Sequence, residues 1–226
     1  MDAVIVTGAA GALGAAVVDE FRARGADVVA LDRPSDRLDE LGAEEGMHAV
    51  PVDLASRDAV QVAFTAIDRL PVEPTALVGL AGGFTPGELA DVDEEMLDSL
   101  WRSNFGSALW TAQAAAPRFA ARGGGAIVNV GSKSAVEGPA AVAHGTSKAA
   151  VVRLTQLLAD ELRPQRIRVN AVLPSVIDTP ANRTWMPPDL AARAVAPSAI
   201  AKVIAFLCSE DAAPISGAAI PVYGDA

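Results

Sequence analysis

Short apolar runs rich in β-branched residues alternate with helix-length segments along this chain. Residues 3–8, AVIVTG, are apolar up to the threonine and end at a glycine, which is typical of a strand buried on both faces. Residues 13–24 follow with a helical pattern, and residues 26–32, ADVVALD, form a second apolar run of the same kind. A strand, a helix and a strand within about 30 residues predict a parallel pair joined by a right-handed crossover.

The same alternation continues to the end of the chain without repeats, low-complexity tracts or linkers. Its 51% hydrophobic content is enough for one well-filled core. We therefore predict an α/β fold: a single doubly wound Rossmann-type domain over residues 1–226, a seven-stranded parallel sheet with helices on both faces. The expected strands are residues 3–8, 26–32, 48–54, 75–81, 123–132, 166–173 and 217–223. The expected helices are residues 13–24, 36–45, 56–69, 93–121 (bent near Pro117), 142–162 and 197–209.

Charge and composition exclude several classes of function. A formal net charge of −10 argues against binding to nucleic acid, which needs a basic face. No apolar run reaches the roughly 18 residues that a membrane span needs, and the start MDAVIVTG lacks the pattern of a signal peptide. The single cysteine, Cys208, lies in the apolar run VIAFLC, so we interpret it as a buried hydrophobic residue. We expect a soluble, cytoplasmic protein that acts on a small molecule, with no metal site.

A glycine-rich turn, residues 7–14 (TGAAGALG), joins the first strand to the first helix. Gly8, Gly11 and Gly14 would let the backbone turn tightly and approach a diphosphate, and the helix N-terminus adds free N–H groups and a favourable dipole. A tight strand-to-helix turn without a ligand is the plainer interpretation. The place of the motif in a βαβ unit favours a dinucleotide.

Asp32 ends the second predicted strand. A carboxylate there would hydrogen-bond both ribose hydroxyls of an adenosine and repel a 2′-phosphate, which favours NAD(H) over NADP(H). Arg33 is adjacent and could contact a phosphate, and Asp32 could also be a solvated turn residue.

Residues 129–148, NVGSKSAVEGPAAVAHGTSK, carry the groups capable of chemistry. Ser132 follows a predicted strand, and His144 and Lys148 are four residues apart, so a helix would place them on one face. A hydroxyl, an imidazole and an ammonium would then converge at the carboxyl end of a strand, where open α/β sheets place their ligands.

With these motifs the chain resembles the short-chain dehydrogenase/reductase family along its whole length. The family's TGxxxGxG appears with Ala12 in place of the middle glycine, its NNAG appears as GLAG at residues 79–82, and its PG motif appears as residues 174–175. The resemblance implies an NAD(P) cofactor held by Gly8, Gly11, Leu13, Gly14, Asp32, Asp53, Leu54, Ala81, Gly82, Lys148, Pro174, Ile177 and Thr179.

The resemblance also implies the catalytic set Asn104, Ser132, His144 and Lys148. In the family, Ser holds the substrate oxygen, Tyr exchanges the proton, Lys lowers the Tyr pKa and binds ribose, and Asn orders a water. His144 stands in the Tyr position, which makes this an atypical member. An imidazole reaches less far than a phenol, and the Lys148 ammonium would favour the neutral ring.

Three roles for His144 remain open: a substitute acid/base in a dehydrogenase, a group for another reaction such as proton abstraction, dehydration or cyclisation, or an inert side chain. We predict an NAD(H)-dependent oxidoreductase that interconverts a carbonyl and a hydroxyl on a small cyclic or aromatic molecule. The alternative is a non-redox enzyme or a catalytically weak cofactor-binding protein. Residues 180–197 would form a short substrate lid, in which Trp185 either stacks on substrate or anchors packing. The family resemblance implies a homodimer or homotetramer.

Overall fold

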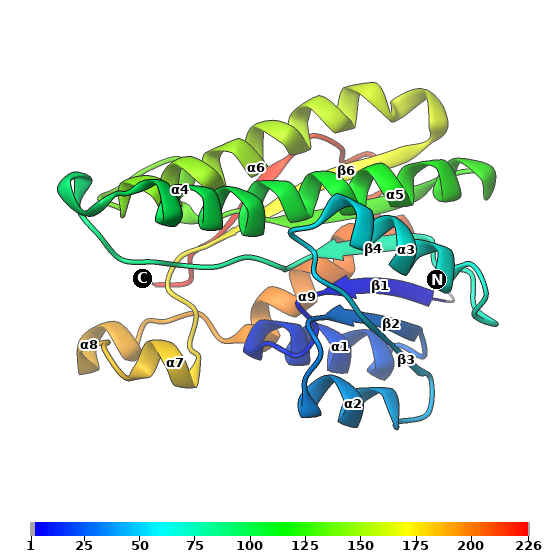
Figure 1. The fold of residues 1–226 in the computed structure, drawn as a ribbon, viewed down its shortest axis with the longest axis horizontal. Coiled ribbons are helices and arrows are strands. Elements are labelled where there is room, and N and C mark those ends of the chain that lie inside the picture. The colour runs from blue at the N-terminus through cyan, green and yellow to red at the C-terminus, as the bar shows by residue number, and fades with distance from the viewer. Residues whose placement is uncertain (1–2, 226) are drawn as a thin grey trace.

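The sheet has seven parallel strands, as the sequence predicts, and their order is β3-β2-β1-β4-β5-β6-β7. A computed structural model of the chain describes residues 3–225. Helices cover both faces: in Figure 1, α5 and α6 lie above the strands and α1 and α2 below them. The strands are β1 (Ala3–Thr7), β2 (Asp27–Asp32), β3 (Met47–Pro51), β4 (Ala76–Gly79), β5 (Gly125–Val130), β6 (Ile167–Pro174) and β7 (Ala219–Val222).

The helices occupy the segments between the strands. The α-helices are α1 (Ala12–Ala23), α2 (Asp36–Gly42), α3 (Arg57–Ile67), α4 (Glu94–Leu100), α5 (Ser107–Ala121), α6 (Val142–Glu161), α7 (Pro180–Arg183), α8 (Pro188–Ala191) and α9 (Pro197–Cys208). Short 3₁₀ turns are η1 (Leu89–Asp91), η3 (Lys133–Ala135), η4 (Arg163–Gln165) and η5 (Glu210–Ala212), and η2 (Trp101–Gly106) is π-helical. No helix among residues 3–225 is long and apolar enough to cross a membrane.

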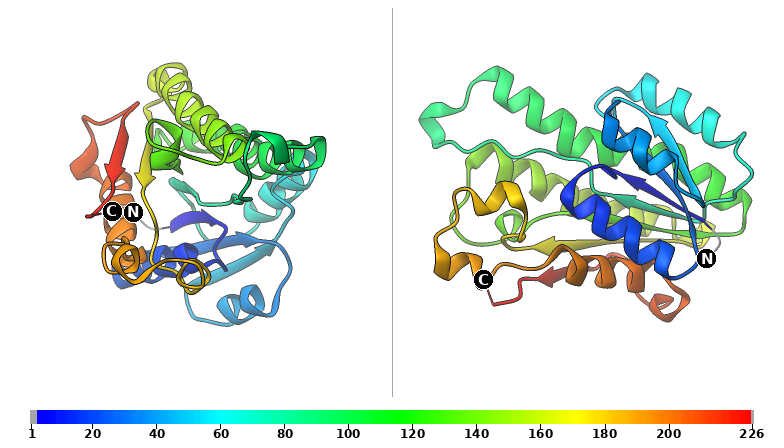
Figure 2. Two further views of the ribbon diagram at one scale, coloured as in Figure 1. Left: turned by 90° about the vertical axis from the view of Figure 1, so that its left-hand side faces the viewer. Right: turned by 90° about the horizontal axis from the view of Figure 1, so that it is seen from below.

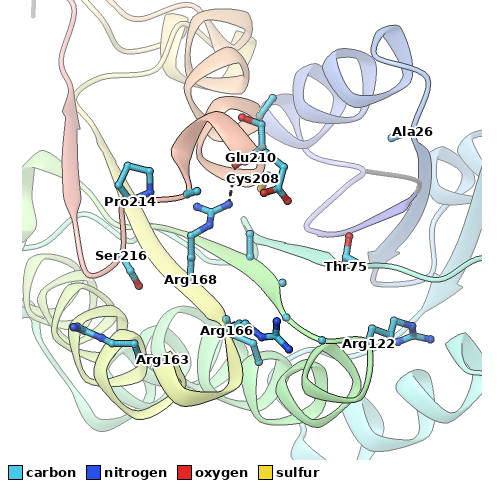
Figure 3. Close-up of a pocket in the computed structure, with 18 of the residues that line it drawn as sticks. Ala26, Thr75, Arg122, Arg163, Arg166, Arg168, Cys208, Glu210, Pro214 and Ser216 are labelled. Carbon is cyan, nitrogen blue, oxygen red and sulfur yellow. Dashed lines mark hydrogen bonds between the residues drawn. The ribbon is translucent and has the colours of Figure 1, made fainter.

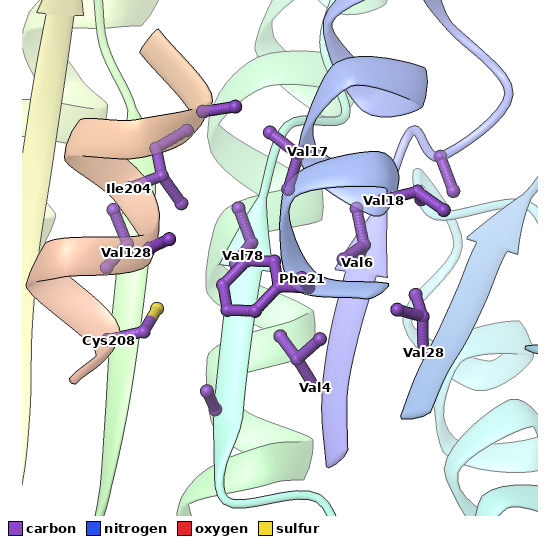
Figure 4. Close-up of a cluster of buried hydrophobic side chains, with 14 of the residues drawn as sticks. Val4, Val6, Val17, Val18, Phe21, Val28, Val78, Val128, Ile204 and Cys208 are labelled. Carbon is purple, nitrogen blue, oxygen red and sulfur yellow. The ribbon is translucent and has the colours of Figure 1, made fainter. Parts of the chain in front are cut away.

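Alternate residues of each strand enter two separate hydrophobic cores, because successive side chains point to opposite faces of a sheet. Val4 and Val6 of β1 pack in the core beneath α1 and α9, together with Phe21. Figure 4 shows this cluster, in which Ile204 and Cys208 come from α9. Cys208 is buried and free, and burial raises the pKa of its thiol to about 12, so it is a packing residue as predicted.

The second core lies on the other face of the sheet, beneath α3, α5 and α6. Ile5, the residue between the two valines of β1, belongs to it, with Phe64 of α3 and Phe119 of α5. The end view in Figure 2 separates the two helical layers. Burial on both faces explains why the strands read as nearly continuous apolar runs.

Residues 94–121 are helical throughout, close to the 93–121 that the sequence predicts, but the irregularity is not at Pro117. Two α-helices, α4 and α5, flank the π-helical segment η2, and α5 continues through Pro117. The departure from α geometry therefore lies upstream of the proline.

The order in which strands are added to the sheet reverses at β1, which pairs with β2 on one side and β4 on the other. The crossovers to either side of β1 therefore run on opposite faces, which leaves a crevice at the carboxyl ends of β1 and β4. The glycine turn and the segments after β4, β5 and β6 all begin at this edge.

Candidate active site

The turn between β1 and α1 is built so closely that side chains are excluded from it. Gly8 has a φ of +65°, a left-handed conformation that favours glycine. A Cβ on Gly14 would lie 2.1 Å from the Gly8 carbonyl oxygen and 2.7 Å from that of Ala9. Gly11 is the N-cap residue of α1 and has no side chain over the helix end. The turn therefore leaves a cradle at the N-terminus of a helix, and this fits a dinucleotide diphosphate.

Thr7 ties this turn to the loop after β4. Its hydroxyl accepts hydrogen bonds from the N–H groups of Leu80 and Ala81, at 3.0 and 3.1 Å, and lies 3.4 Å from the Val78 carbonyl oxygen. A Cβ on Gly8 would come within 3.1 Å of the Ala81 nitrogen. Thr7 belongs to the glycine-rich sequence motif, but the motif alone does not predict these hydrogen bonds between the loops after β1 and β4.

Asp32 lies at the carboxyl end of β2, where its carboxylate faces the glycine turn. One oxygen accepts a hydrogen bond from Ala10 N–H at 2.9 Å, and the other accepts one from Arg33 N–H at 2.8 Å. Two carboxylate oxygens have about four acceptor positions, so capacity remains for ribose hydroxyls. The structure thus places Asp32 beside the diphosphate cradle.

The two residues after β3 that resemble the family's adenine contact lie near this position. Asp53 is exposed and accepts a hydrogen bond from Ala55 N–H at 3.0 Å. Leu54 is buried. The N–H of Val52 donates to the Asp32 carbonyl oxygen at 2.8 Å, which holds this loop beside β2.

His144, in the first turns of α6, contacts the loop after β4. Its Nδ1 lies 3.2 Å from the Gly83 carbonyl oxygen, and its ring meets Phe84 edge-on with centroids 5.0 Å apart. A carbonyl oxygen only accepts, so Nδ1 carries the hydrogen and the neutral ring has its lone pair on Nε2. Burial, and then the Lys148 charge, lower the pKa of His144 below its ordinary 6.5. Near neutral pH, Nε2 is therefore a proton acceptor.

Asn104 clamps the same glycine from η2. Its side-chain oxygen accepts from Gly83 N–H at 2.8 Å, and its amide nitrogen donates to the Gly83 carbonyl at 3.2 Å and to the Ser147 hydroxyl at 2.9 Å. The Ser147 hydroxyl donates in turn to the His144 carbonyl at 2.8 Å. Gly83 and Ser147 were missed by sequence reasoning; the paired glycines after β4 were the available signal for the first.

Lys148 lies one helical turn beyond His144 and is only 8% exposed. Its ammonium donates to the Val130 carbonyl oxygen at 2.9 Å, at the end of β5. Burial lowers the pKa of this ammonium from 10.5 to about 8. A Cβ on Gly82 would come within 2.4 Å of the Asn104 side-chain oxygen and 3.1 Å of the Lys148 nitrogen. Glycine at 82 therefore lets the loop after β4 pass directly against these two polar groups.

Ser132 follows β5 and begins η3. Its hydroxyl accepts from Ser134 N–H at 3.2 Å and lies 2.8 Å from the Ser134 hydroxyl. The turn η3 packs on the start of α6, where a Cβ on Gly145 would lie 3.1 Å from the Ser134 carbonyl oxygen. The structure therefore brings His144, Lys148 and Asn104 together around residues 82–83, with Ser132 on the neighbouring turn rather than bonded to them.

The segment after β6 contributes the remaining predicted residues. Pro174 is the buried last residue of β6, and Ile177 forms an isolated bridge with Val195. Thr179 caps α7 by accepting a hydrogen bond from Asn182 N–H at 3.1 Å. Arg183, considered from the sequence as a cation for a substrate carboxylate, instead forms an ion pair with Asp178.

Metal ligands do not gather here. Within residues 3–225, no three His, Cys, Asp or Glu side chains are placed to hold an ion. The crevice thus offers a nucleotide cradle, a neutral imidazole and a buried ammonium.

The fold and this crevice define a doubly wound protein of the dinucleotide-binding class. A profile of the short chain dehydrogenase family matches residues 2–189. The chain is 33% identical to D-xylose 1-dehydrogenase of Caulobacter vibrioides, over 95% of this chain and 91% of that protein. It belongs to the short-chain dehydrogenase/reductase family of NAD(P)-dependent oxidoreductases, whose members act on hydroxyl and carbonyl groups.

Solved structures agree over nearly the full length of the chain. L-sorbose reductase from Gluconobacter frateurii, complexed with NADPH and L-sorbose, has a TM-score of 0.91 and 27% identity, covering 99% of this chain and 95% of that one. A 3-ketoacyl-(acyl-carrier-protein) reductase from Brucella melitensis, complexed with NADH, has a TM-score of 0.90 and 28% identity, covering 99% and 97%. These relatives bind one or the other of the two nicotinamide cofactors, so they leave the choice for this chain to its own residues.

Proposed function

We propose that this protein is an NAD(H)-dependent oxidoreductase that interconverts a hydroxyl and a carbonyl on a small cyclic or aromatic molecule, with His144 as the proton-exchanging group. The observation that carries the proposal is the arrangement at residues 82–83. The neutral imidazole and the buried ammonium meet there, next to the cradle that Gly8 and Gly14 leave open. Bound nicotinamide would take up or return a hydride at this edge of the sheet.

The protein's own groups then divide the work. Gly8, Gly11, Leu13 and Gly14 would hold the diphosphate, and Asp32 would accept hydrogen bonds from the adenosine ribose. Asp53, Leu54, Ala81, Gly82, Pro174, Ile177 and Thr179 would line the rest of the cofactor, as in the family, and the Lys148 ammonium would contact the nicotinamide ribose. The carboxylate at position 32 supports NAD(H), because it would repel a 2′-phosphate.

Proton transfer is the role we assign to His144. In the oxidation direction the substrate O–H bond breaks and its proton passes to His144 Nε2, while the C–H bond of the carbon that bears this oxygen breaks and its hydride would pass to bound NAD⁺. The hydrogen bond to the Gly83 carbonyl keeps the Nδ1 proton away from the substrate and holds the ring in the accepting tautomer. Asn104 and Ser147 position this loop and helix, and Ser132 would hold the substrate oxygen from the neighbouring turn.

Exposed aromatic rings support the proposed class of substrate. Phe84 is 61% exposed and contacts the His144 ring, and Trp185, between α7 and α8, is 56% exposed. Such faces suit a flat or cyclic molecule. Residues 180–197 would act as the short lid over it. The exposed Trp101 and Leu157 on the outer helices support a homodimer or homotetramer.

The test combines an NADH fluorescence titration with a turnover screen over alcohols, sugars and ketones. His144→Ala should lower kcat by about 10²- to 10⁴-fold, the usual contribution of a positioned acid or base, while NADH binding persists. The matched control is His48→Ala, since His48 is the other histidine of the chain and lies on β3. In wild type, the oxidation rate should fall as pH drops through the lowered His144 pKa, and His144→Ala should lose this acidic limb.

Each outcome separates the alternatives. NADH binding with no turnover on any substrate would favour the non-redox or weakly catalytic protein of the same fold. Full activity in His144→Ala would overturn the assignment of the imidazole. Absence of NADH and NADPH binding would overturn both functions, because both depend on the glycine turn.

A further inference from the structure

A second pocket, with a volume of about 930 Å³, lies at the opposite edge of the sheet from the candidate active site. Its walls include residues at or just before the amino ends of strands: Ala26 before β2, Thr75 before β4, Gly125 at the start of β5 and Ile167 at the start of β6. Parallel strands begin at one edge and end at the other, so this pocket is separate from the nucleotide crevice.

The pocket gathers an unusual share of the chain's positive charge. The protein carries 18 Lys and Arg against 28 Asp and Glu, yet a single acidic residue, Glu210, lines the pocket within the described chain. Figure 3 shows Arg166 and Arg168 near the centre of the pocket, with Arg163 and Arg122 to either side. The lining arginines are Arg24, Arg122, Arg163, Arg166 and Arg168.

Favourable interaction with the negative C-terminal ends of helices explains only some of these five arginines. Arg24 and Arg122 immediately follow α1 and α5, where a cation balances the helix dipole. Arg168 extends from β6 and donates to the carbonyl oxygens of Leu207 and Ser209, at 2.7 and 3.0 Å, at the end of α9. Arg166 is exposed, and within residues 3–225 its guanidinium makes no hydrogen bond or ion pair, so its charge is available to a ligand.

Two of the lining arginines, Arg122 and Arg163, have partners that an anion would replace at little cost, and Arg24 pairs with Glu20 at 2.6 Å. Arg163 pairs with Asp160 at 2.7 Å, and Arg122 approaches Glu73 at 3.7 Å. Exposed pairs of this kind contribute little to stability, whereas a guanidinium binds phosphate or carboxylate oxygens in a two-pronged geometry.

The backbone holds Arg166 in place before any ligand arrives. Its N–H donates to the Arg163 carbonyl at 2.9 Å, and its own carbonyl accepts from Gly125 N–H at 3.2 Å. Its φ is 58°, and a Cβ on Gly124 would lie 2.6 Å from its carbonyl oxygen. A site whose backbone is fixed in advance loses less entropy on binding.

From this geometry we propose that the pocket binds a small anion with two or more negative charges, through its phosphate or carboxylate oxygens. Arg166 and Arg168 contact the anion at the centre of the pocket, and Arg122 and Arg163 turn from their exposed partners to contact it. A pocket of this volume accommodates a small ligand of that kind. The proposal does not rest on the oxidoreductase function, because no residue of the crevice takes part.

Isothermal titration calorimetry of the full chain tests the proposal, with tripolyphosphate and citrate as two separate probes. NADH is present in excess to compete with either probe at the glycine turn. Arg166→Asn removes the cation while asparagine tolerates the left-handed backbone, and should weaken binding about tenfold or more. Arg69→Gln is the matched control, an exposed arginine near the same edge that does not line the pocket. Arg163→Gln, on an exposed turn, gives the same comparison if Arg166→Asn folds poorly.

The two probes distinguish the source of the negative charge. Binding of tripolyphosphate alone assigns the site to phosphate compounds, and binding of citrate alone assigns it to polycarboxylates. In either case affinity should fall as salt is raised, because the interaction is between charges. No binding of either probe, or binding that the arginine variants leave unchanged, would overturn the proposal.

Discussion

Replacing Gly14 with alanine sets two effects of opposite sign against each other. Gly14 lies within α1, and a helical glycine is less favourable than alanine by about 1 kcal/mol, so propensity alone predicts a more stable protein. The structure predicts the reverse, because the new methyl group would lie 2.1 Å from the Gly8 carbonyl oxygen. A Cβ is fixed to the backbone and the Gly8 oxygen belongs to it, so no side-chain rotation can relieve this contact and the turn itself must move.

The steric cost is the larger of the two. Relief of a 2.1 Å approach to an ordinary contact requires a shift of roughly 1 Å or more in the turn, and overpacking of this kind costs about 1–3 kcal/mol or more. After the gain in propensity we expect a net loss of about 2 kcal/mol, which lowers the Tm of a chain of this length by about 4–8 °C. Displacement of the turn should also raise the Kd for NADH at least tenfold.

Gly11→Ala is the matched control, since its Cβ would lie 3.3 Å from the same Gly8 oxygen and its φ of −75° suits any residue. It should change the free energy of unfolding by less than about 1 kcal/mol. Differential scanning fluorimetry and NADH titration of both variants provide the measurement. If Gly14→Ala matched wild type in Tm and in NADH affinity, the close-packed cradle would not be the nucleotide site.

Three further predictions concern the polar groups of the crevice. Asp32→Asn keeps an acceptor for Ala10 N–H but removes the charge, so the ratio of NADPH to NADH affinity should rise about tenfold in fluorescence titrations; an unchanged ratio would contradict the role of the carboxylate. Asn104→Ala loses three hydrogen bonds of about 1 kcal/mol each, so urea denaturation should show a loss of about 2–4 kcal/mol. Lys148 has a pKa lowered from 10.5 to about 8, so the unfolded state binds the extra proton between these values, and stability should rise with pH from about 8 to 10.5 in urea melts; Lys148→Met should abolish that rise.

The fold was predictable from the sequence because burial on both faces marks each strand. Residues such as Val4, Ile5 and Val6 enter opposite cores, so every position of the run must be apolar. The seven strands and their parallel arrangement are confirmed. The π-helical segment between α4 and α5 was not predicted, because it changes the hydrogen-bond spacing without a distinctive residue pattern.

The candidate site was predictable as a set of positions but not as a set of contacts. The spacing of His144 and Lys148 placed both on one helix face, and the structure has both at residues 82–83. The tautomer of the imidazole depends on the Gly83 carbonyl, which is distant in sequence and carries no side chain. The ion pair between Arg183 and Asp178 was not predicted either, because the two side chains are brought together by the folding of α7.

The π-helical segment η2 has a consequence for how this chain tolerates insertions and deletions. A residue added to or removed from a helix rotates everything beyond it by about 100°. Asn104 of η2 faces the Gly83 loop, while the buried alanines of α5 face the sheet. Side chains of one continuous helical segment must therefore point in two different directions. Deletion of one residue from Trp101–Gly106 would tighten the segment into ordinary α-helix and rotate Asn104 relative to α5. The length of this segment therefore bears on whether Asn104 can bond Gly83 while the alanines of α5 pack on the sheet.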